Sequence, residues 1–282
     1  MNKILWFRND LRILNNDAFI EATKSGNILP IFIFDKEYYK LPTSSSFHLD
    51  FLKSSLEELT IKLSEKCNCK LNIYYGNTLE IISHLIDKFK INEVYSNIIF
   101  KNIYITNLDK KVSFLFEEKN VHWRIFNQFG VQLNHRIRNK WSYNWNKFIN
   151  SEHASPDIDC GFIKDDHVED LTKIKTNNIE NGHIQAGGRK NAIELLESFL
   201  NDRSENYQRE MSSPVTGEVS CSRLSPHIAF GNISIKEIFK KTNDKLKSEL
   251  SYTKKKSLIA FKSRLAWHCH FIQKLYDEPE IE

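Results

Sequence analysis

The chain lacks the features that would place a protein in or across a membrane. None of its apolar runs approaches the roughly 18 residues that a membrane-spanning helix needs. The run that follows Met1 is short and ends at the polar residues Arg8, Asn9 and Asp10, which does not fit a secretory signal. We therefore expect a soluble, cytoplasmic protein that has no membrane partner.

Cysteine is scarce, and its spacing argues against two common kinds of site. The 282 residues include five cysteines, which are Cys67, Cys69, Cys160, Cys221 and Cys269. An odd number without C-x-x-C spacing argues against a disulfide framework and against a cysteine-rich metal centre. His268 and His270 flank Cys269, but neighbouring helical residues point about 100° apart and cannot converge on one ion. We expect reduced thiols and no metal.

The charge of the chain is nearly balanced overall but uneven locally. The net charge is +4, which neither requires nor excludes a nucleic acid partner. Between Gly231 and Arg264, however, ten basic residues stand against three acidic ones. Such a stretch is typical of a solvated helix face, and a phosphate-binding surface is the alternative.

The first part of the chain alternates apolar runs of strand length with amphipathic runs of helix length. This pattern predicts a Rossmann-like, doubly wound parallel sheet, which we assign to residues 1–130. The expected strands are Lys3 to Phe7, Ile28 to Phe34, Lys70 to Tyr75, Glu93 to Tyr95 and His122 to Phe126. The expected helices are Asp17 to Lys24, Ser45 to Lys66, Thr78 to Lys88 and Leu108 to Lys119. The turn from Trp6 to Arg12 contains no glycine, so we expect no dinucleotide there.

The second half of the chain changes character. Residues 131–185 lose periodicity, and we interpret them as an interdomain connector that wraps over the surface with short helices in it. Residues 186–282 are predicted to be all-helical. The expected helices are Lys190 to Leu200, one launched by Pro226, Ser234 to Lys241, and Thr253 to Tyr276. Ser234 and Glu237 have the spacing of a capping box.

One helix start has the composition of an anion-binding site. Ser225 is a favoured N-cap and Pro226 a favoured first helical residue. The free N–H groups and the helix dipole suit a phosphate, and Arg223 could add a charge-assisted hydrogen bond. The alternative is an ordinary capped helix whose arginine faces water.

Several motifs, taken in their order along the chain, resemble the photolyase and cryptochrome flavoprotein family. Within that family they are most similar to a bacterial branch of deoxyribodipyrimidine photolyase-like proteins, and the resemblance covers essentially the whole chain. The motifs are Trp6-Phe-Arg-Asn-Asp-Leu-Arg12, Gly187-Gly188-Arg-Lys-Asn-Ala192, Tyr207, Cys221-Ser-Arg-Leu-Ser-Pro226 and Trp267-His-Cys-His-Phe271.

The resemblance implies a blue-light flavoprotein with FAD in the helical domain, which in repair members passes an electron to a pyrimidine dimer flipped out of DNA. It places Tyr207 and Phe261 against the cofactor and Trp267 against the lesion, where it could stack on a base. For these three residues, plain core packing is the alternative. The residues that would hold the FAD phosphates are Cys221, Ser222, Arg223, Leu224 and Ser225.

Two departures from the family pattern limit this reading. Arg264 stands where dimer-repairing members carry a glutamate that touches the damaged bases, and this change favours a blue-light sensor that repairs nothing. Family members also continue well past Glu282. We therefore expect a chain truncated within the FAD-binding domain, inactive as it stands and weak in FAD binding, and a monomer when full length. A full-length repair member would be a carbon–carbon lyase.

Two points stay open on the sequence alone. The residues after the fourth strand lack the pattern that accompanies a folate antenna, so an antenna chromophore is unassigned. A bare nucleotide-binding α/β module, for which residues 1–126 would suffice, is a third interpretation.

Overall fold

The computed structural model contains two compact units. Its described residues are 1–133, 140–151, 155–165, 167–176 and 184–281. Unit 1 comprises Met1–Gln128 with Ala154–Gly188, and unit 2 comprises Phe129–His153 with Arg189–Glu282. The boundaries drawn from the sequence after residues 130 and 185 stay a prediction. Within the described ranges, no helix combines the length and the apolar character needed to cross a bilayer.

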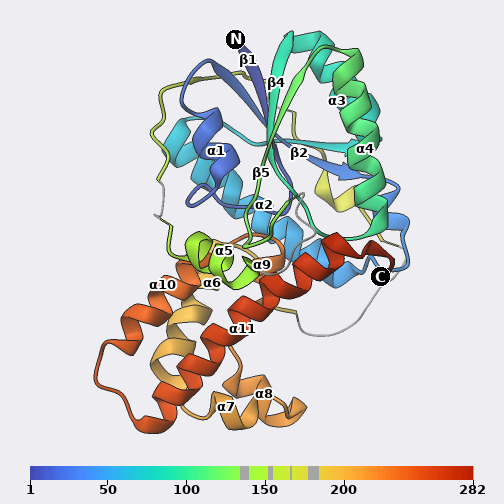
Figure 1. The fold of residues 1–282 in the computed structure, drawn as a ribbon. Helices are drawn as coiled ribbons and strands as arrows, with labels where there is room; N and C mark the ends of the chain where they lie inside the picture. The colour runs from blue at the N-terminus through green and yellow to red at the C-terminus, as the bar shows by residue number, and fades with distance from the viewer. Residues whose placement is uncertain (134–139, 152–154, 166, 177–183, 282) are drawn as a thin grey trace. The chain divides into compact units, whose positions relative to one another are not determined.

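Unit 1 is built on a parallel sheet with strand order β3-β2-β1-β4-β5, as Figure 1 shows. The strands are β1 (Asn2–Phe7), β2 (Asn27–Asp35), β3 (Asn72–Gly76), β4 (Ile91–Asn97) and β5 (His122–Phe126), and the short β6 (Gly161–Phe162) pairs with the start of β2. The Rossmann-like parallel sheet expected from the sequence is confirmed. The strand order reverses between β1 and β4, and in such sheets the carboxyl ends of the two strands at this point flank a crevice.

The helices of unit 1 follow the predicted bounds closely, with one exception. They are α1 (Asp17–Ala22), η1 (Tyr38–Lys40), α2 (Ser46–Cys67), α3 (Thr78–Phe89), α4 (Ile103–Glu118) and η3 (Leu171–Lys173). Helix α4 begins at Ile103 rather than at Leu108, because the side chain of Asn102 caps it by accepting from the Ile105 N–H at 3.1 Å. The polar Thr106 in the first turn hides this start from the apolar pattern.

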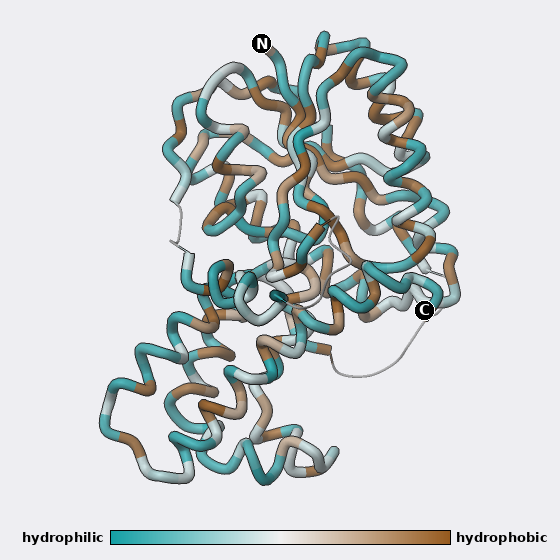
Figure 2. Tube along the Cα trace, in the orientation of Figure 1, coloured by the Kyte–Doolittle hydropathy of each residue, from teal (hydrophilic) through white to brown (hydrophobic). Residues whose placement is uncertain are grey.

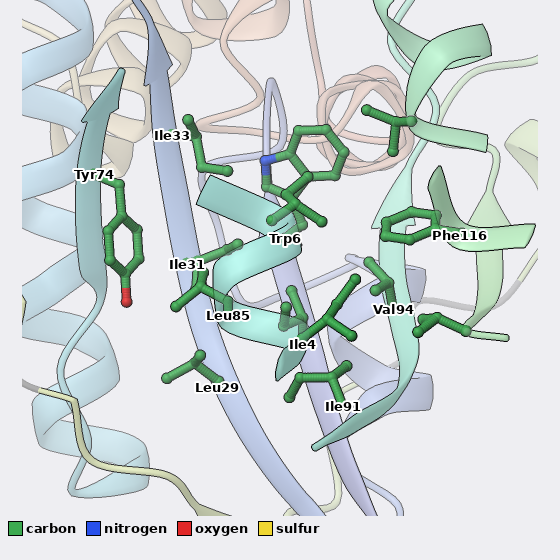
Figure 3. Packing of buried hydrophobic residues seen from close by; sticks show 14 of the residues in the cluster. Ile4, Trp6, Leu29, Ile31, Ile33, Tyr74, Leu85, Ile91, Val94 and Phe116 are labelled. Atoms are coloured by element: carbon green, nitrogen blue, oxygen red, sulfur yellow. The ribbon is translucent and has the colours of Figure 1, made fainter. Parts of the chain in front are cut away.

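The core of unit 1 lies on both faces of the sheet. Along β1, Ile4 and Trp6 face α3 and α4, where they join a cluster with Val94 and Phe116 (Figure 3). Phe7 points to the other face, and its ring lies 6.2 Å from that of Phe19 on α1. Hydrophobic residues follow the strands in Figure 2, as expected for strands buried on both faces.

The segment predicted as a connector also contributes to the sheet of unit 1. Besides forming β6, it runs beside β3, where the Ile73 N–H donates to the carbonyl of His167 at 2.8 Å. The short helices expected within residues 131–185 are present as η3 and, in unit 2, α5 (Trp141–Ile149). Residues 134–139, 152–154, 166 and 177–183 of the expected connector lie outside the described part of the chain.

Unit 2 is helical, as predicted, throughout its described residues. Besides α5 its helices are α6 (Arg189–Ser198), η4 (Phe199–Arg203), α7 (Tyr207–Glu210), α8 (Pro214–Ser220), α9 (Ser225–Ala229), α10 (Ile235–Leu246), α11 (Tyr252–Asp277) and η5 (Pro279–Ile281). The π-helical η4 continues α6 past Leu200, where the sequence predicted the helix to end, and the short α7 and α8 were not predicted. The long final helix agrees with the prediction.

The capping box predicted at α10 forms only in part. The hydroxyl of Ser234 accepts from the Glu237 N–H at 3.1 Å, which is the expected cap. The Glu237 carboxylate does not accept from the Ser234 N–H in turn, because it accepts two hydrogen bonds from the Arg189 guanidinium at 2.7 and 2.9 Å. A tertiary ion pair therefore replaces half of the local motif.

Candidate functional site

The loop Cys221–Ser225, which we call the cradle loop, connects α8 to α9 in unit 2. The prediction that Ser225 is the N-cap is wrong. Ser225 is the first residue of α9 and the cap is Leu224, whose backbone is already helical and whose side chain offers no capping oxygen. Leu224 is only 1% exposed, so burial of this apolar side chain fixes where the helix starts.

The backbone of the cradle loop turns its polar residues outward. Arg223 has a φ of +62°, a left-handed conformation that is costly for a residue with a side chain and that gathers at functional sites. On either side of the buried Leu224, Arg223 and Ser225 are exposed, while Cys221 and Ser222 are half-buried. The loop thus offers two hydroxyls and a guanidinium on its accessible side.

Arg203 supports the backbone of the cradle loop. Its guanidinium donates to the backbone carbonyls of Cys221 and Ser222, the latter at 3.3 Å, and to Leu195 at 2.8 Å. Burial, followed by the nearby charge of Arg223, lowers the pKa of Arg203. Because the loop carbonyls are occupied by Arg203, the loop conformation depends on a residue that the sequence did not single out.

Three aromatic rings pack beside the cradle loop. Tyr207 lies at right angles to Phe199, with ring centroids 5.4 Å apart, and to Phe261 at 5.8 Å. Burial raises the pKa of Tyr207 to about 12, the nearby thiol of Cys221 acts in the same direction, and Arg264 lowers it. The structure therefore brings together Tyr207, Phe261, Cys221 and Arg264, which were predicted from separate parts of the sequence.

Trp267 lies on the accessible side of α11. It is 51% exposed, and its ring packs against exposed Phe271 with centroids 6.2 Å apart. The guanidinium of Arg264 lies 4.6 Å from the centre of the Trp267 ring, one turn earlier on the same helix. Core packing, the alternative considered for Trp267, does not hold, because the buried stripe of α11 runs through Phe261, Leu265 and Cys269.

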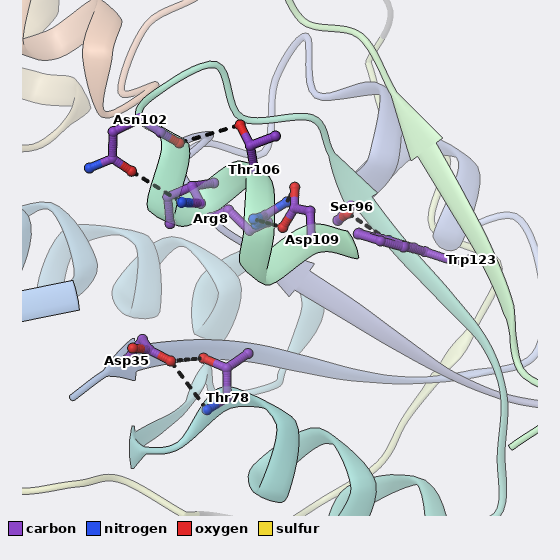
Figure 4. A network of polar contacts seen from close by, with 9 residues as sticks. Arg8, Asp35, Thr78, Ser96, Asn102, Thr106, Asp109 and Trp123 are labelled. Atoms are coloured by element: carbon purple, nitrogen blue, oxygen red, sulfur yellow. Dashed lines mark hydrogen bonds and ion pairs between the residues drawn. The ribbon is translucent and has the colours of Figure 1, made fainter. Parts of the chain in front are cut away.

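Unit 1 has a second polar site, at the carboxyl ends of β1 and β4. Figure 4 shows Arg8, which follows β1, in a two-point ion pair with Asp109 of α4, with N–O distances of 2.5 and 3.0 Å. The guanidinium also lies 4.5 Å from the centre of the Trp6 ring. Arg8 therefore has protein partners on two sides and ties the end of β1 to α4.

A fully buried carboxylate organises the turn that follows Arg8. Asp10 accepts from the Arg8 N–H at 2.7 Å and from the side-chain amides of Asn97 at 2.5 Å and Asn16 at 3.3 Å. Burial is the largest influence on Asp10 and raises its pKa despite these hydrogen bonds. In the Trp6-to-Arg12 motif, Arg8 and Asp10 thus build the turn at the switch of strand order.

Asp35, at the end of β2, closes the crevice beside that turn. Its carboxylate accepts from the hydroxyls of Thr78 and Tyr104, both at 2.6 Å, and from the backbone N–H of Tyr38 (Figure 4 shows the Thr78 contact). The cavity that remains has a volume of about 60 Å³. Pockets for drug-sized ligands usually measure ~300–1,000 Å³, so this crevice has no room for a large ring system in the conformation seen.

Comparison with known proteins shows which proteins the chain resembles. The model of the DNA photolyase family matches residues 3–133. The blue-light photoreceptor PHR2 of Arabidopsis thaliana is 23% identical over 282 aligned positions, covering 88% of this chain and 61% of that protein. The chain is therefore similar to photolyases and cryptochromes. A chloroplastic or mitochondrial cryptochrome DASH of Solanum lycopersicum is 31% identical over 101 residues, covering 33% of this chain and 17% of that protein.

Solved photolyases share the fold of the chain. The archaeal photolyase of Sulfolobus tokodaii, described with two FAD molecules, superimposes with a TM-score of 0.74 at 22% identity. The match covers 100% of this chain and 61% of that one. The matched part of the chain thus spans between about a sixth and three fifths of the length of the relatives compared with it.

The sequence pointed to the cradle loop and its aromatic neighbours, but it did not point to the residues that support them. Arg203 carries no motif, and only its place after Phe199-Leu200 could have drawn attention to it. The Asp10 and Asn97 pair is separated by 87 residues, so no local pattern connects the two. Among the described residues, no group of histidine, cysteine or acidic side chains is arranged to hold a metal ion.

Proposed function

We propose that the protein in its full-length form binds FAD through the cradle loop of unit 2 and uses it for blue-light-driven electron transfer to pyrimidine dimers in DNA. The observation that carries this proposal is the outward-facing Arg223 at a strained backbone position, flanked by Ser222 and Ser225 and held by Arg203. The likeness to photolyases and cryptochromes makes a flavin the expected ligand.

The residues of unit 2 fit the two ends of such a cofactor. A guanidinium and two hydroxyls are the donors that a diphosphate requires. Tyr207 and Phe261 are buried beside the loop and pack edge to face on each other, so they would border a planar ring system. Burial raises the pKa of Tyr207 further above its ordinary value of 10, to about 12, so the phenol stays protonated and brings no negative charge to the site.

FAD, once bound, would supply the photochemistry, and the residues of this chain would bind and orient. Arg223 would neutralise the diphosphate, and Arg203 would hold the loop in place. The exposed Trp267 would stack on a base displaced from the duplex, a contact worth ~1–3 kcal/mol. Arg264, stacked on Trp267, could contact a phosphate of the same strand.

The cofactor part of the proposal is tested by titrating the full chain with FAD and, separately, with adenosine diphosphate. Arg223→Ala should weaken both ligands about tenfold or more, because a hydrogen bond to a charged group is worth ~1.5–3 kcal/mol. The matched control is Arg209→Ala, an exposed arginine on α7 outside the cradle loop, which should bind as the parent does. Equal affinities for the parent and Arg223→Ala would exclude the cradle loop as the phosphate site.

The repair part is tested separately, with a DNA oligonucleotide that contains a thymine dimer, under blue light and a reductant. Cleavage that is lost in Trp267→Ala supports dimer repair. Flavin binding without dimer cleavage would instead support a blue-light sensor, the interpretation to which Arg264 points. Arg264→Glu places a carboxylate beside Trp267 and should increase dimer cleavage if the absent carboxylate is what limits repair.

A further inference from the structure

One face of α11 is exposed along most of the length of the helix. Its large apolar side chains, each between 51% and 73% exposed, are Tyr252, Ile259, Trp267 and Phe271. At roughly 100° of rotation per residue, these four positions lie within a sector of about 120°, so they form one stripe. The other side of α11 packs on α7 and α10 (Figure 1). The stripe is therefore separate from the core of unit 2.

The size of this stripe is typical of an interaction surface. An aromatic side chain has roughly 150–250 Å² of surface, so the exposed parts of the three rings amount to roughly 270–450 Å². Monomeric proteins rarely expose a larger continuous apolar patch, and patches of this size often mark a binding surface. A stable interface buries ~800 Å² on each partner. The polar side chains beside the stripe must supply the rest.

The charges at the two ends of α11 differ in sign. Lys255 and Lys256 are exposed in the first two turns, whereas Glu278 and Glu280 are exposed directly after the last turn. This placement opposes the helix dipole, which favours anions near the start of a helix and cations near its end. Only Lys274, in the last turn, follows the dipole. Local helix stability therefore does not account for these charges, whereas a partner with the opposite charge at each end does.

The charged ends are placed symmetrically about Trp267. Lys256 precedes Trp267 by 11 residues and Glu278 follows it by 11, which is about 16 Å along the helix in each direction. Two α11 helices that meet antiparallel at Trp267 therefore bring Lys256 of each copy to Glu278 of the other. Phe271, four residues after Trp267, then meets the small Ser263, four residues before it. A parallel pair would instead place lysine against lysine.

We propose that the exposed face of α11 is the docking site for a second copy of this chain, which binds antiparallel about a two-fold axis at Trp267. The two Trp267 rings meet at the axis, and Arg264 stays 4.6 Å from the ring centre of the Trp267 in its own copy. Such a two-fold pair uses one surface twice and is the commonest symmetric assembly. The proposal goes beyond the proposed function. Because both use Trp267, the dimer and a base stacked on Trp267 exclude each other.

The test measures the mass of the full chain, 33.2 kDa as a monomer, by sedimentation equilibrium over a range of concentrations, without flavin or DNA. The parent should approach twice that mass as its concentration rises. Lys255→Glu with Lys256→Glu reverses the basic end, and Glu278→Lys with Glu280→Lys reverses the acidic end. Each double variant alone should raise the dimer dissociation constant roughly tenfold or more, because every dimer contains the altered contact twice.

An equal mixture of the two double variants should restore association. In the mixed dimer one contact joins the two reversed ends and the other joins the two unchanged ends, so both contacts are attractive. A parallel pair would not be weakened by either variant alone, since its like charges already face each other. Weakening by each variant together with rescue in the mixture therefore identifies the antiparallel arrangement.

Two further variants separate the apolar stripe from charge in general. Trp267→Ala should raise the dimer dissociation constant roughly thirtyfold, which is the size of an interface hot spot. Lys110→Glu with Lys111→Glu is the matched control, because it reverses two adjacent exposed lysines on α4. Its dissociation constant should equal that of the parent.

Either of two results would overturn the proposal. One is a parent chain that stays a monomer at every concentration. The other is a mixture of the two double variants that associates no more tightly than either variant alone. Since no step of the test uses flavin or DNA, failure of the dimer leaves the proposed photochemistry untouched, and failure of flavin binding leaves the dimer untouched.

Discussion

Arg203 donates hydrogen bonds to the backbone carbonyls of Cys221 and Ser222, and so a residue of the π-helical turn η4 supports the loop proposed to hold a diphosphate. The same guanidinium lies 5.8 Å from the ring centre of Phe199, which in turn packs on Tyr207. The phosphate end and the aromatic end of the candidate site are therefore joined through one side chain. Any change at Arg203 should affect both ends.

Replacement of Arg203 by methionine should weaken adenosine diphosphate binding although Arg203 is not expected to touch the ligand. The loop carbonyls would lose their donor, and a buried acceptor without a partner costs ~1–3 kcal/mol in unfolding free energy. Urea denaturation and ligand titration measure the two effects. Arg209→Met is the matched control, since Arg209 is exposed on α7. Unchanged affinity in a folded Arg203→Met variant would contradict the supporting role.

The ion pair of Arg8 and Asp109 should be strongly coupled. The Arg8 side chain is 4% exposed, so Asp109→Asn leaves a buried guanidinium without its counter-charge, which costs ~3–5 kcal/mol of unfolding free energy. Arg8→Met combined with Asp109→Leu removes both charges and should cost less than the sum of the single changes. Urea denaturation of the four proteins measures the coupling, and strict additivity would show that the pair contributes nothing.

Asp10 should make the stability of the chain depend on pH. Its pKa is raised in the folded protein above the ordinary value of 3.8, so the folded state keeps the proton at pH values where the unfolded chain has lost it. The contribution of Asp10 to stability is therefore greatest below 3.8 and falls as the pH rises towards its folded pKa. Urea denaturation between pH 3.5 and 8, chosen as roughly that window, should show a decrease with rising pH that is absent in Asp10→Asn.

Asp10→Asn should also lower stability at neutral pH by ~1–3 kcal/mol, because the amide nitrogen that replaces one carboxylate oxygen cannot accept. Either the Arg8 N–H or both Asn16 and Asn97 then lose their acceptor. Asp50→Asn, at an exposed position on α2, is the control and should leave the pH profile unchanged. A parent profile identical to that of Asp10→Asn would show that Asp10 does not titrate in this range.

Tyr207 should contribute to stability mainly through its ring. Tyr207→Ala opens a cavity between Phe199 and Phe261 and should cost ~3–5 kcal/mol, whereas Tyr207→Phe keeps the packing and should change unfolding free energy by less than about 1.5 kcal/mol. Thermal denaturation with FAD present and absent separates stability from binding. A Tyr207→Phe variant as unstable as Tyr207→Ala would show that the hydroxyl, rather than the ring, is what matters.

The sequence by itself determined the order and type of the main elements, because apolar periodicity and capping residues act over a few neighbouring positions. Asn77 illustrates this, since its side chain caps α3 by accepting from the Leu79 and Glu80 N–H groups. Ser225 shows where local composition alone fails to predict the structure. It has the composition of a cap, but burial of Leu224 moves the cap by one residue.

Only the tertiary structure decided which polar groups meet. Arg203 reaches Cys221 and Asp10 reaches Asn97, in each case across at least 18 residues of chain. The structure also decided which side of α11 carries Trp267, since an apolar stripe and an exposed aromatic pair look alike in sequence. The physical reason is that packing between distant segments brings these partners together. The same packing buries them, and a buried hydrogen bond is stronger than one exposed to water.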